Sequence, residues 1–254
     1  MMYETIKTHV EDSVCYVQIH RPLANNTIND RLVAECHQVL SACEQSASIV
    51  VLSGSPEVFC FGADFKALTG ASSATIHEQN TPGPLYDLWL RLASGPFVTI
   101  AHVRGKANAG GIGFVAACDI VLADETAQFS LSELLFGLYP ACVLPFLIRR
   151  VGFQKAHYLT LMTQPMGASQ ARDWGLVDAV ETPSDMLLRR HLLRLRRLSK
   201  AAIGRYKSYM SKIDTPLATL KAPAVAANLQ MFSDGGNLQA IGRYVERGVF
   251  PWEK

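Results

Sequence analysis

The chain has 254 residues, of which 49% are hydrophobic and 18% charged, so it can bury a large core and is not an intrinsically disordered protein. Its formal net charge of +2 is too small to indicate a nucleic-acid or membrane partner. No apolar run approaches the roughly 20 residues that cross a bilayer, and the first residues lack the apolar core of a signal peptide. We therefore expect a cytoplasmic protein with one large domain and a helical appendage.

Cysteine and histidine usage indicates no metal site. The six cysteines form no CxxC pair, and the seven histidines are scattered without an HxxxH or HExxH spacing. An even number of cysteines would permit disulfides, but most of them lie in apolar contexts in a long chain, so we predict reduced, buried thiols. We expect neither a metal nor a bound cofactor.

The first quarter of the chain has a strand–strand–helix–strand order. Alternating apolar residues predict strands over residues 3–10 and 14–20. Asn29 or Asp30 can cap the amphipathic helix that follows. A wholly apolar run at 49–52 is typical of a strand covered on both faces. This order excludes an all-helical fold and predicts a repeated ββα pattern.

The middle of the chain alternates turns, helices and strands. A glycine turn at 59–66 leads toward a helix, and the polar residues 70–83 predict a surface loop. Residues 84–92 have the apolar spacing of a helix, and the apolar run 97–103 predicts a strand. A second glycine-rich turn at 105–113 follows this strand.

The last part of the chain is mainly helical. Apolar spacing predicts helices over about 143–151, 154–163 and 223–247, and Ser169 can cap a further short helix. A short strand is predicted at 176–180. Between these segments lies a long amphipathic stretch in which cations greatly outnumber acids.

The stretch 102–140 combines a strand, a glycine-rich turn and one acidic residue. A strand, a turn and a helix start expose backbone N–H groups that can hold an oxyanion. Glu133 is the single charged side chain in residues 126–139. A carboxylate in an apolar setting is a candidate general acid or base.

Five motifs, taken together and in order, resemble the crotonase family (enoyl-CoA hydratase/isomerase). They are spread over nearly the whole chain, and each alone is a weak signal. They are HRP and NNTIN within 20–29, FGADFK at 61–66, VRG, GG and CDI within 103–120, QFSLSE with the later glycine and proline within 128–140, and WGLV at 174–177.

The resemblance implies a fold and an assembly. It implies an α/β fold with a crotonase-like spiral core of repeated ββα units over residues 1–183. It also implies a C-terminal helical region over residues 184–254 that serves for trimerisation, giving a homotrimer or a hexamer.

The resemblance also implies site residues. The backbone N–H groups of Ala63 and Gly110 would form an oxyanion hole for a thioester carbonyl. Two preorganised donors can each lower the barrier to an enolate by about 3–4 kcal/mol. Tyr86, Lys66 and Gly111 are expected to contact the substrate.

The chain departs from the hydratases of the family at one position. Those enzymes carry two catalytic glutamates, of which the second matches Glu133. The first lies three residues after the oxyanion glycine Gly110, and this chain has Gly113 there. One-glutamate members can be isomerases, decarboxylases or dehydratases, so the loss does not fix the reaction.

Longer phrases resemble the PksH-type dehydratases of polyketide β-branching cassettes. The resemblance implies dehydration of a 3-hydroxy-3-methylglutaryl group, held on the phosphopantetheine of an acyl carrier protein, to 3-methylglutaconyl. Glu133 would remove the C2 proton. The second proton would come either from Glu133 itself, in a syn elimination, or from Asp64, which could instead only cap a helix. The phrases lie at 25–30, 56–65, 84–89, 129–145 and 191–198.

Other roles stay open at this point. The distal carboxylate of a glutaryl group needs a cation, and Lys66 or Arg104 could supply it. The basic part of residues 184–213 could be a solvated helix face, a subunit contact or a docking surface for an acidic carrier protein. The alternatives to the carrier-bound dehydratase are an enoyl-CoA hydratase/isomerase or decarboxylase that acts on a CoA thioester, and a non-catalytic scaffold.

Overall fold

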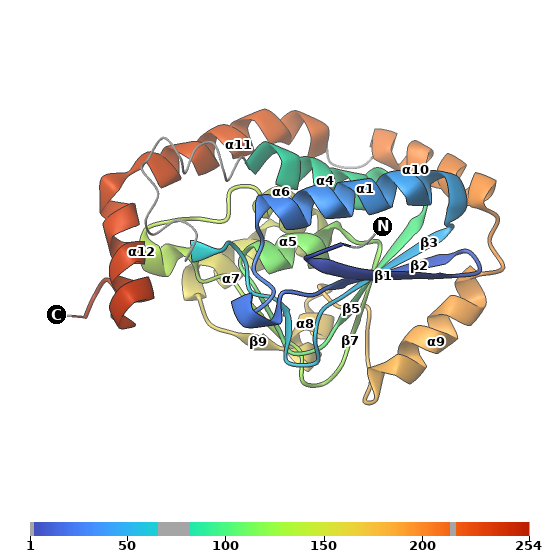
Figure 1. The fold of residues 1–254 in the computed structure, drawn as a ribbon, viewed down its shortest axis with the longest axis horizontal. Coiled ribbons are helices and arrows are strands. Elements are labelled where there is room, and N and C mark those ends of the chain that lie inside the picture. The colour runs from blue at the N-terminus through green and yellow to red at the C-terminus, as the bar shows by residue number, and fades with distance from the viewer. Residues whose placement is uncertain (1–2, 66–81, 214–216, 254) are drawn as a thin grey trace.

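The computed structural model describes residues 3–65, 82–213 and 217–253, and it shows two β-sheets enclosed by helices (Figure 1). The chain repeats a unit in which one strand enters the larger sheet, the next enters the smaller sheet, and a helix follows. This is the ββα repeat that the sequence predicts, and it confirms the α/β class.

The larger sheet has six strands in the order β1-β2-β3-β5-β7-β10. Its first pair is an antiparallel hairpin, and its other neighbouring strands are parallel. Parallel neighbours require long crossover connections, which the helices provide. The strands are β1 (Ile6–Glu11), β2 (Val14–Ile19), β3 (Ile49–Ser53), β5 (Val98–Val103), β7 (Ile120–Ala123) and β10 (Ala179–Val180).

The smaller sheet places the ends of three parallel strands side by side. Its order is β4-β6-β8-β9, with β4, β6 and β8 parallel and β9 antiparallel to β8. Because parallel strands end at the same edge of a sheet, the segments that follow β4, β6 and β8 meet there. The strands are β4 (Val58–Cys60), β6 (Lys106–Asn108), β8 (Gln128–Ser130) and β9 (Met166–Gly167).

Ten α-helices and two 3-10 helices (η) are seen in the described part of the chain. The side chain of Asn29 caps the first long helix by accepting a hydrogen bond of 2.9 Å from the N–H of Leu32, as predicted. The helices are η1 (Pro22–Ala24), α1 (Asp30–Ser46), α4 (Pro82–Ser94), α5 (Gly110–Ala117), η2 (Glu133–Phe136), α6 (Leu144–Val151), α7 (Phe153–Met162), α8 (Ala168–Asp173), α9 (Ser184–Leu195), α10 (Lys200–Ile213), α11 (Leu217–Ser233) and α12 (Gly235–Arg247).

Both faces of the larger sheet are covered, as its apolar third strand predicts. Val50 and Leu52 belong to the main core, whereas Ile49 and Val51 pack on the opposite face with leucines of α9. Figure 1 shows α1 and α4 above the sheet and α9 below it. The six cysteines are all buried and free, which confirms the expected thiols.

A buried ion pair ties the C-terminal helices to the core. The ammonium group of Lys207 on α10 lies 2.6 Å from the carboxylate of Asp119, and it also donates to the backbone oxygens of Leu92 and Phe97. Burial of so large a side chain is tolerated because each of its donors has an acceptor. Leu217 on α11 belongs to the same core as the sheet, so the C-terminal helices pack as part of one body.

Three details of the sequence prediction are wrong. Ser169 lies inside α8, whose N-cap is Gly167, and the predicted strand 176–180 is reduced to Ala179–Val180. The amphipathic stretch 184–213 forms two helices, α9 and α10, which agrees with its helical spacing. Pro223 lies within α11 and does not begin the last helical segment.

The predicted loop at 70–83 lies mostly outside the described residues, and its last two residues already belong to α4. No helix within the described ranges is long and apolar enough to cross a membrane.

Candidate active site

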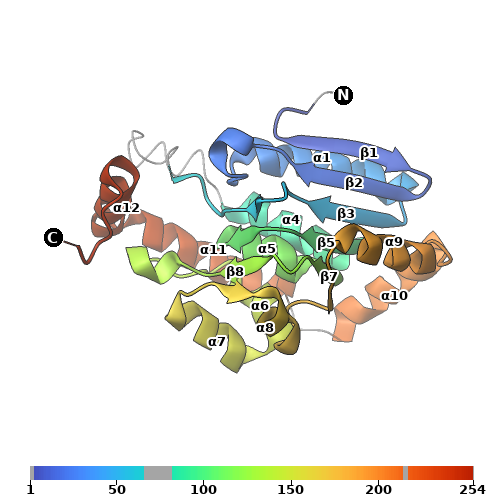
Figure 2. The same cartoon turned by 90° about the horizontal axis from the view of Figure 1, so that it is seen from below.

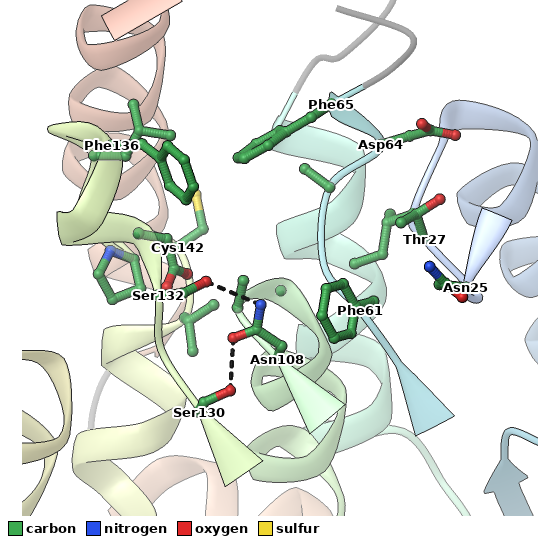
Figure 3. A pocket seen from close by; sticks show the side chains of 18 of the residues that line it. Asn25, Thr27, Phe61, Asp64, Phe65, Asn108, Ser130, Ser132, Phe136 and Cys142 are labelled. Atoms are coloured by element: carbon green, nitrogen blue, oxygen red, sulfur yellow. Dashed lines mark hydrogen bonds between the residues drawn. The ribbon is translucent and has the colours of Figure 1, made fainter. Parts of the chain in front are cut away.

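A cavity of about 1110 Å³ lies at the edge where β4, β6 and β8 end. Its walls come from the segments after these strands, from η2, from the start of α1, and from α11 and α12. This volume slightly exceeds the usual range for small-molecule sites, about 300–1,000 Å³. Figure 3 shows side chains from both walls converging on the cavity.

The two glycine turns meet at this cavity. Ala63 forms a bridge with Ile28, in which the N–H of Ile28 donates to the oxygen of Gly62 (2.7 Å) and the N–H of Asp64 donates to the oxygen of Ile28 (3.2 Å). The bridge therefore does not use the N–H of Ala63. A Cβ added to Gly62 would lie 3.3 Å from the amide nitrogen of Gly110, so the two turns touch. The structure thus brings together the two residues predicted to form the oxyanion hole.

The N–H of Gly110 is held in place by an unusual backbone conformation. Gly110 is the first residue of α5, so its N–H has no acceptor within the helix. The preceding Ala109 has a φ of 51°, which is uncommon for a residue with a Cβ. Its N–H donates to the oxygen of Ser130 (3.0 Å), and its oxygen accepts from Ile112 (2.9 Å). Strain that persists because neighbours fix it is typical of functional sites.

Gly111 serves packing. A Cβ at this position would lie 2.3 Å from the backbone oxygen of Cys60, so only glycine allows α5 to approach β4 this closely. Gly111 is buried and does not line the cavity. The structure therefore places Gly111 behind the cavity wall.

Glu133 lines the cavity as the first residue of η2. Its Oε2 atom is buried and has no hydrogen-bond partner in the described part of the chain. Burial raises the pKa of Glu133 from 4.5 to about 7, against a smaller lowering by the backbone N–H groups of Glu133 and Ser132. A general base works best when its pKa lies near the working pH, and this carboxylate satisfies that condition.

Trp89 on α4 fills the space beside Gly113. A Cβ added to Gly113 would lie 2.4 Å from the indole Cζ2, so no larger residue fits unless the ring moves. Trp89 lines the cavity, and its Nε1 is the other buried side-chain atom without a partner among the described residues. The sequence did not reveal Trp89 as a site residue. The sequence shows that position 113 is not a glutamate. It does not show that the indole of Trp89 occupies the space that a glutamate side chain would need.

A polar network lies on the wall formed by β6 and β8. The hydroxyl of Ser130 donates to Oδ1 of Asn108 (2.8 Å), and Nδ2 of Asn108 donates to Oγ of Ser132 (2.9 Å), as Figure 3 shows. All three residues line the cavity. A lone asparagine in the sequence gives no sign of two serines opposite it, so the place of Asn108 in this network could not be predicted.

Asp64 lines the cavity but is held in an ion pair. Its carboxylate lies 2.9 Å from Nη2 of Arg21, and both side chains are mostly buried. Figure 3 shows the Asp64 side chain pointing away from Asn108. The helix that it was expected to cap lies outside the described residues.

Tyr86 does not line the cavity, contrary to expectation. It is fully buried, its hydroxyl donates to the oxygen of Leu217 (2.7 Å), and its ring packs against Phe146. Its place on the apolar side of α4 turns it toward α11.

Of the two cations considered for a distal carboxylate, Lys66 lies outside the described residues. Arg104 faces Asp185 at 3.8 Å and is not part of the cavity wall.

Aromatic side chains close the cavity on the side of α12. Phe136 of η2 contacts Phe65, Tyr244 and Phe250, with ring centroids 5.8, 5.0 and 6.0 Å apart. All four residues line the cavity. The C-terminal helix thus contributes to the site of its own chain.

The basic segment, which is the cation-rich part of residues 184–213, lies away from the cavity. Figures 1 and 2 show α9 and α10 at the end of the molecule opposite α12. Several of its cations bind neighbouring acids: Arg190 pairs with Glu181, and Arg196 pairs with Glu11 at 3.2 Å. Lys207 is buried, as described above. These contacts show that several cations of the basic segment stabilise the fold through ion pairs within the chain.

Comparison with known proteins gives consistent results. Residues 9–254 match the model of the family described as enoyl-CoA hydratase/isomerase. The chain is 60% identical over 252 residues to the bacillaene synthase dehydratase PksH of Bacillus subtilis, covering 99% of this chain and 97% of that protein. It is 33% identical over 181 residues to the 2,3-dehydroadipyl-CoA hydratase of Escherichia coli, covering 70% and 69% of the two chains.

Solved structures show the same fold. A crystal structure of PksH from Bacillus subtilis, described as a polyketide biosynthesis enoyl-CoA hydratase, superimposes with a TM-score of 0.93 at 58% identity, covering 98% of this chain and 100% of that chain. An enoyl-CoA hydratase/isomerase from Xanthobacter autotrophicus Py2 superimposes with a TM-score of 0.87 at 22% identity, covering 97% and 95%. At that identity, the likeness shows the fold alone.

Proposed function

We propose, on the premise that this chain belongs to the enoyl-CoA hydratase/isomerase family, that it removes water from a 3-hydroxyacyl thioester. The expected family and the expected enzyme class, a hydro-lyase, are confirmed by the family match and by the 60% identity to a dehydratase. The observation that carries the proposal is the site itself. One glutamate with a buried, unpartnered oxygen shares a cavity with two glycine turns, and an indole fills the place of a second carboxylate.

The proposed substrate is a 3-hydroxy-3-methylglutaryl group carried on an acyl carrier protein, with 3-methylglutaconyl as the product. The motifs that resemble the β-branching dehydratases support this choice. The similarity to a bacillaene synthase dehydratase over nearly the whole chain supports it further. The cavity volume of about 1110 Å³ leaves room for the acyl group and for part of the phosphopantetheine arm.

The first step is proton removal from C2. The thioester oxygen accepts hydrogen bonds from the N–H groups of Ala63 and Gly110, and Glu133 takes the C2 proton. The electrons of the broken C–H bond form an enolate, whose negative oxygen those two donors stabilise. A carboxylate with a pKa of about 7 is a stronger base than an exposed glutamate, so it suits this weak carbon acid.

The second step expels the C3 hydroxyl. The enolate carbonyl re-forms, a C2–C3 double bond appears, and the C3–O bond breaks. Protonated Glu133 then gives its proton to the departing hydroxide, so water leaves and the carboxylate is restored. In this syn elimination one carboxylate serves as base and then as acid, which agrees with glycine at position 113.

The two unpartnered atoms define where the C3 hydroxyl binds in this proposal. A hydroxyl group can donate one hydrogen bond and accept another. Oε2 of Glu133 needs a donor, and Nε1 of Trp89 needs an acceptor. The substrate hydroxyl supplies both, and the indole N–H stabilises the oxygen as negative charge develops on it.

Asp64 is given a positioning role in this scheme. Its ion pair with Arg21 fixes the turn that carries Ala63, and Arg21 also holds this region through the backbone oxygen of Thr27. A second acid is not needed when Glu133 returns the proton.

We likewise propose that carrier docking occurs on the face where the cavity opens, because the basic helices α9 and α10 lie at the opposite end of the molecule. Trimerisation through the C-terminal region stays a prediction.

The test is intact-protein mass spectrometry of a 3-hydroxy-3-methylglutaryl carrier protein incubated with the enzyme. We expect a mass loss of one water with the wild type and no loss with Glu133→Gln. The corresponding free CoA ester should react more slowly than the carrier-bound substrate. If the carrier substrate is unchanged while the CoA ester reacts, the carrier assignment is wrong. If neither reacts, the dehydratase proposal is wrong.

A further inference from the structure

The cavity wall contains one cation among the described residues, Lys106 on β6. The other charged side chains of the wall are Asp30, Asp64 and Glu133. Lys106 is exposed, and its ammonium group has no ion pair within the part of the chain that the structure describes. This differs from Lys207, which is buried and fully hydrogen bonded. A cation that faces a cavity without a partner is available to an anionic ligand.

Lys106 belongs to a row of polar side chains on one face of the β6–β8 pair. Lys106 and Asn108 are separated by the buried Ala107, so they point to the same face of β6. On the neighbouring strand Gln128 pairs with Lys106, and Ser130 pairs with Asn108. Together with Ser132, these residues form what we call the β6–β8 row, and all of them line the cavity.

The hydrogen bonds within the row leave donors unused. An asparagine amide has two N–H donors, and a serine hydroxyl has one donor. The Ser130 hydroxyl donates its proton to Oδ1 of Asn108, and Asn108 donates one of its two amide N–H groups to Oγ of Ser132. The second Asn108 N–H and the Ser132 hydroxyl proton therefore remain for a ligand. A lysine ammonium and two neutral donors form a set suited to a carboxylate.

The short chain connection limits how far Lys106 can lie from the oxyanion hole. Lys106 lies four residues before Gly110, so at about 3.3 Å per residue their Cα atoms are at most about 13 Å apart. A thioester bound at Gly110 extends its acyl chain from one end of this gap. The four-carbon stem of lysine extends from the other end.

We propose that the β6–β8 row binds a carboxylate at the far end of the acyl chain, with Lys106 as the ion-pair partner. This makes the enzyme selective for acyl thioesters that end in a carboxylate. The inference rests on the proposed function for the position of the thioester. It replaces Lys66 and Arg104, the two cations that the sequence offered for this role.

The test compares two carrier-bound substrates, one ending in a carboxylate (3-hydroxy-3-methylglutaryl) and one ending in a methyl group (3-hydroxy-3-methylbutyryl). We expect Lys106→Met to lower kcat/KM for the first by about 30-fold, mainly through KM, and to leave the second nearly unchanged. Lys106→Arg should restore most of the loss, because it restores the charge. Lys7→Met, which removes a lysine of β1 outside the cavity, is the matched control.

A binding measurement separates failure of this inference from failure of the proposed function. Calorimetry with pantetheine thioesters of the two acyl groups does not depend on turnover. If the wild type binds the carboxylate ester more tightly and Lys106→Met abolishes that preference, the subsite stands even without dehydration. If Lys106→Met weakens both esters equally, or weakens neither, the assignment of Lys106 is overturned.

Discussion

Two glutamates with buried carboxylate oxygens have opposite environments. Glu35 on α1 accepts hydrogen bonds from the N–H groups of Glu4 and Thr5, from the Thr5 hydroxyl and from Nε of Arg31, at 2.5–3.0 Å. Glu133 in the cavity has one oxygen with no partner in the described structure. Burial disfavours ionisation of Glu35, but Arg31 and the other donors outweigh it and lower its pKa to about 2. Burial dominates at Glu133 and raises its pKa to about 7.

The difference shows what distinguishes a structural carboxylate from a reactive one. A carboxylate whose oxygens are all bound stabilises the fold and has nothing left for a substrate. A carboxylate with an open oxygen weakens the folded state when it is ionised, and its missing partner can come from the ligand. Glu35 joins the N-terminal segment to α1, and Glu133 faces the cavity, so stability and reactivity are separated between two regions.

The largest effect should come from Glu133→Gln. Glutamine keeps the size of the side chain but cannot accept the C2 proton, so we expect kcat for dehydration to fall about 1,000-fold or more. Single-turnover assays with the carrier substrate would measure it, and far-ultraviolet circular dichroism would check the fold. Glu35→Gln is the control and should keep near-normal kcat. Near-normal turnover by Glu133→Gln would sink the mechanism.

Glu35→Gln should instead destabilise the protein. One accepting oxygen becomes an NH₂ group that faces the donors of Thr5, so we expect a loss of about 3 kcal/mol of unfolding free energy. Urea denaturation followed by tryptophan fluorescence would measure this loss. An unchanged denaturation midpoint would mean that the hydrogen bonds to Glu35 do not stabilise the fold.

The two glutamates should respond oppositely to pH. Glu133 has a folded pKa raised above its unfolded value of 4.5, so its stabilising contribution is full below pH 4.5 and is lost as pH rises through about 7. Glu35 has a lowered pKa, so its contribution is present above pH 4.5 and is lost as pH falls toward 2. As the pH rises from 5.5 to 8, the free energy of unfolding of Glu133→Gln should therefore rise by about 2 kcal/mol relative to that of the wild type.

Denaturation of the two proteins at several pH values would measure that gain. The pH dependence of wild-type activity should report the same ionisation, because only ionised Glu133 acts as the base. We expect kcat/KM to fall with decreasing pH below about 7. A profile that is flat from pH 5 to 8 would show that another group removes the proton.

The smallest effect is expected for Trp89→Phe. Phenylalanine keeps an aromatic ring beside Gly113 but removes the N–H donor, so kcat should fall about 10-fold, which is about 1.4 kcal/mol of barrier. Trp252→Phe, which changes an exposed tryptophan near the C-terminus, is the matched control. An effect on KM alone, with kcat unchanged, would show that the indole shapes the cavity without assisting the leaving hydroxyl.

Much of the fold could be predicted because its signals are local. Alternation in β2, the wholly apolar β3 and the Asn29 cap each depend on a few neighbouring residues. The turn between α9 and α10 could not be predicted, since leucines and cations continue through it at helical spacing. Pro223 within α11 was misread because a proline usually marks the first turn of a helix.

The site was only partly predictable for a similar reason. Glu133 and the glycine turns lie in motifs with fixed spacing, so the sequence identified them. Trp89, Ser130 and Lys106 come from separate segments that meet only around the cavity. Tyr86 was misplaced, because the sequence indicates that α4 is amphipathic without stating which neighbour each side contacts.

The packing of Trp89 against Gly113 limits the mutational paths open to this enzyme. A glutamate at position 113 would begin with a Cβ 2.4 Å from the indole, so that single change should not be tolerated. A small residue in place of Trp89 would leave a core cavity that costs about 3–5 kcal/mol. Both one-step intermediates toward a two-carboxylate site are therefore destabilised. An engineer who wishes to build a two-carboxylate site must therefore change both positions at once.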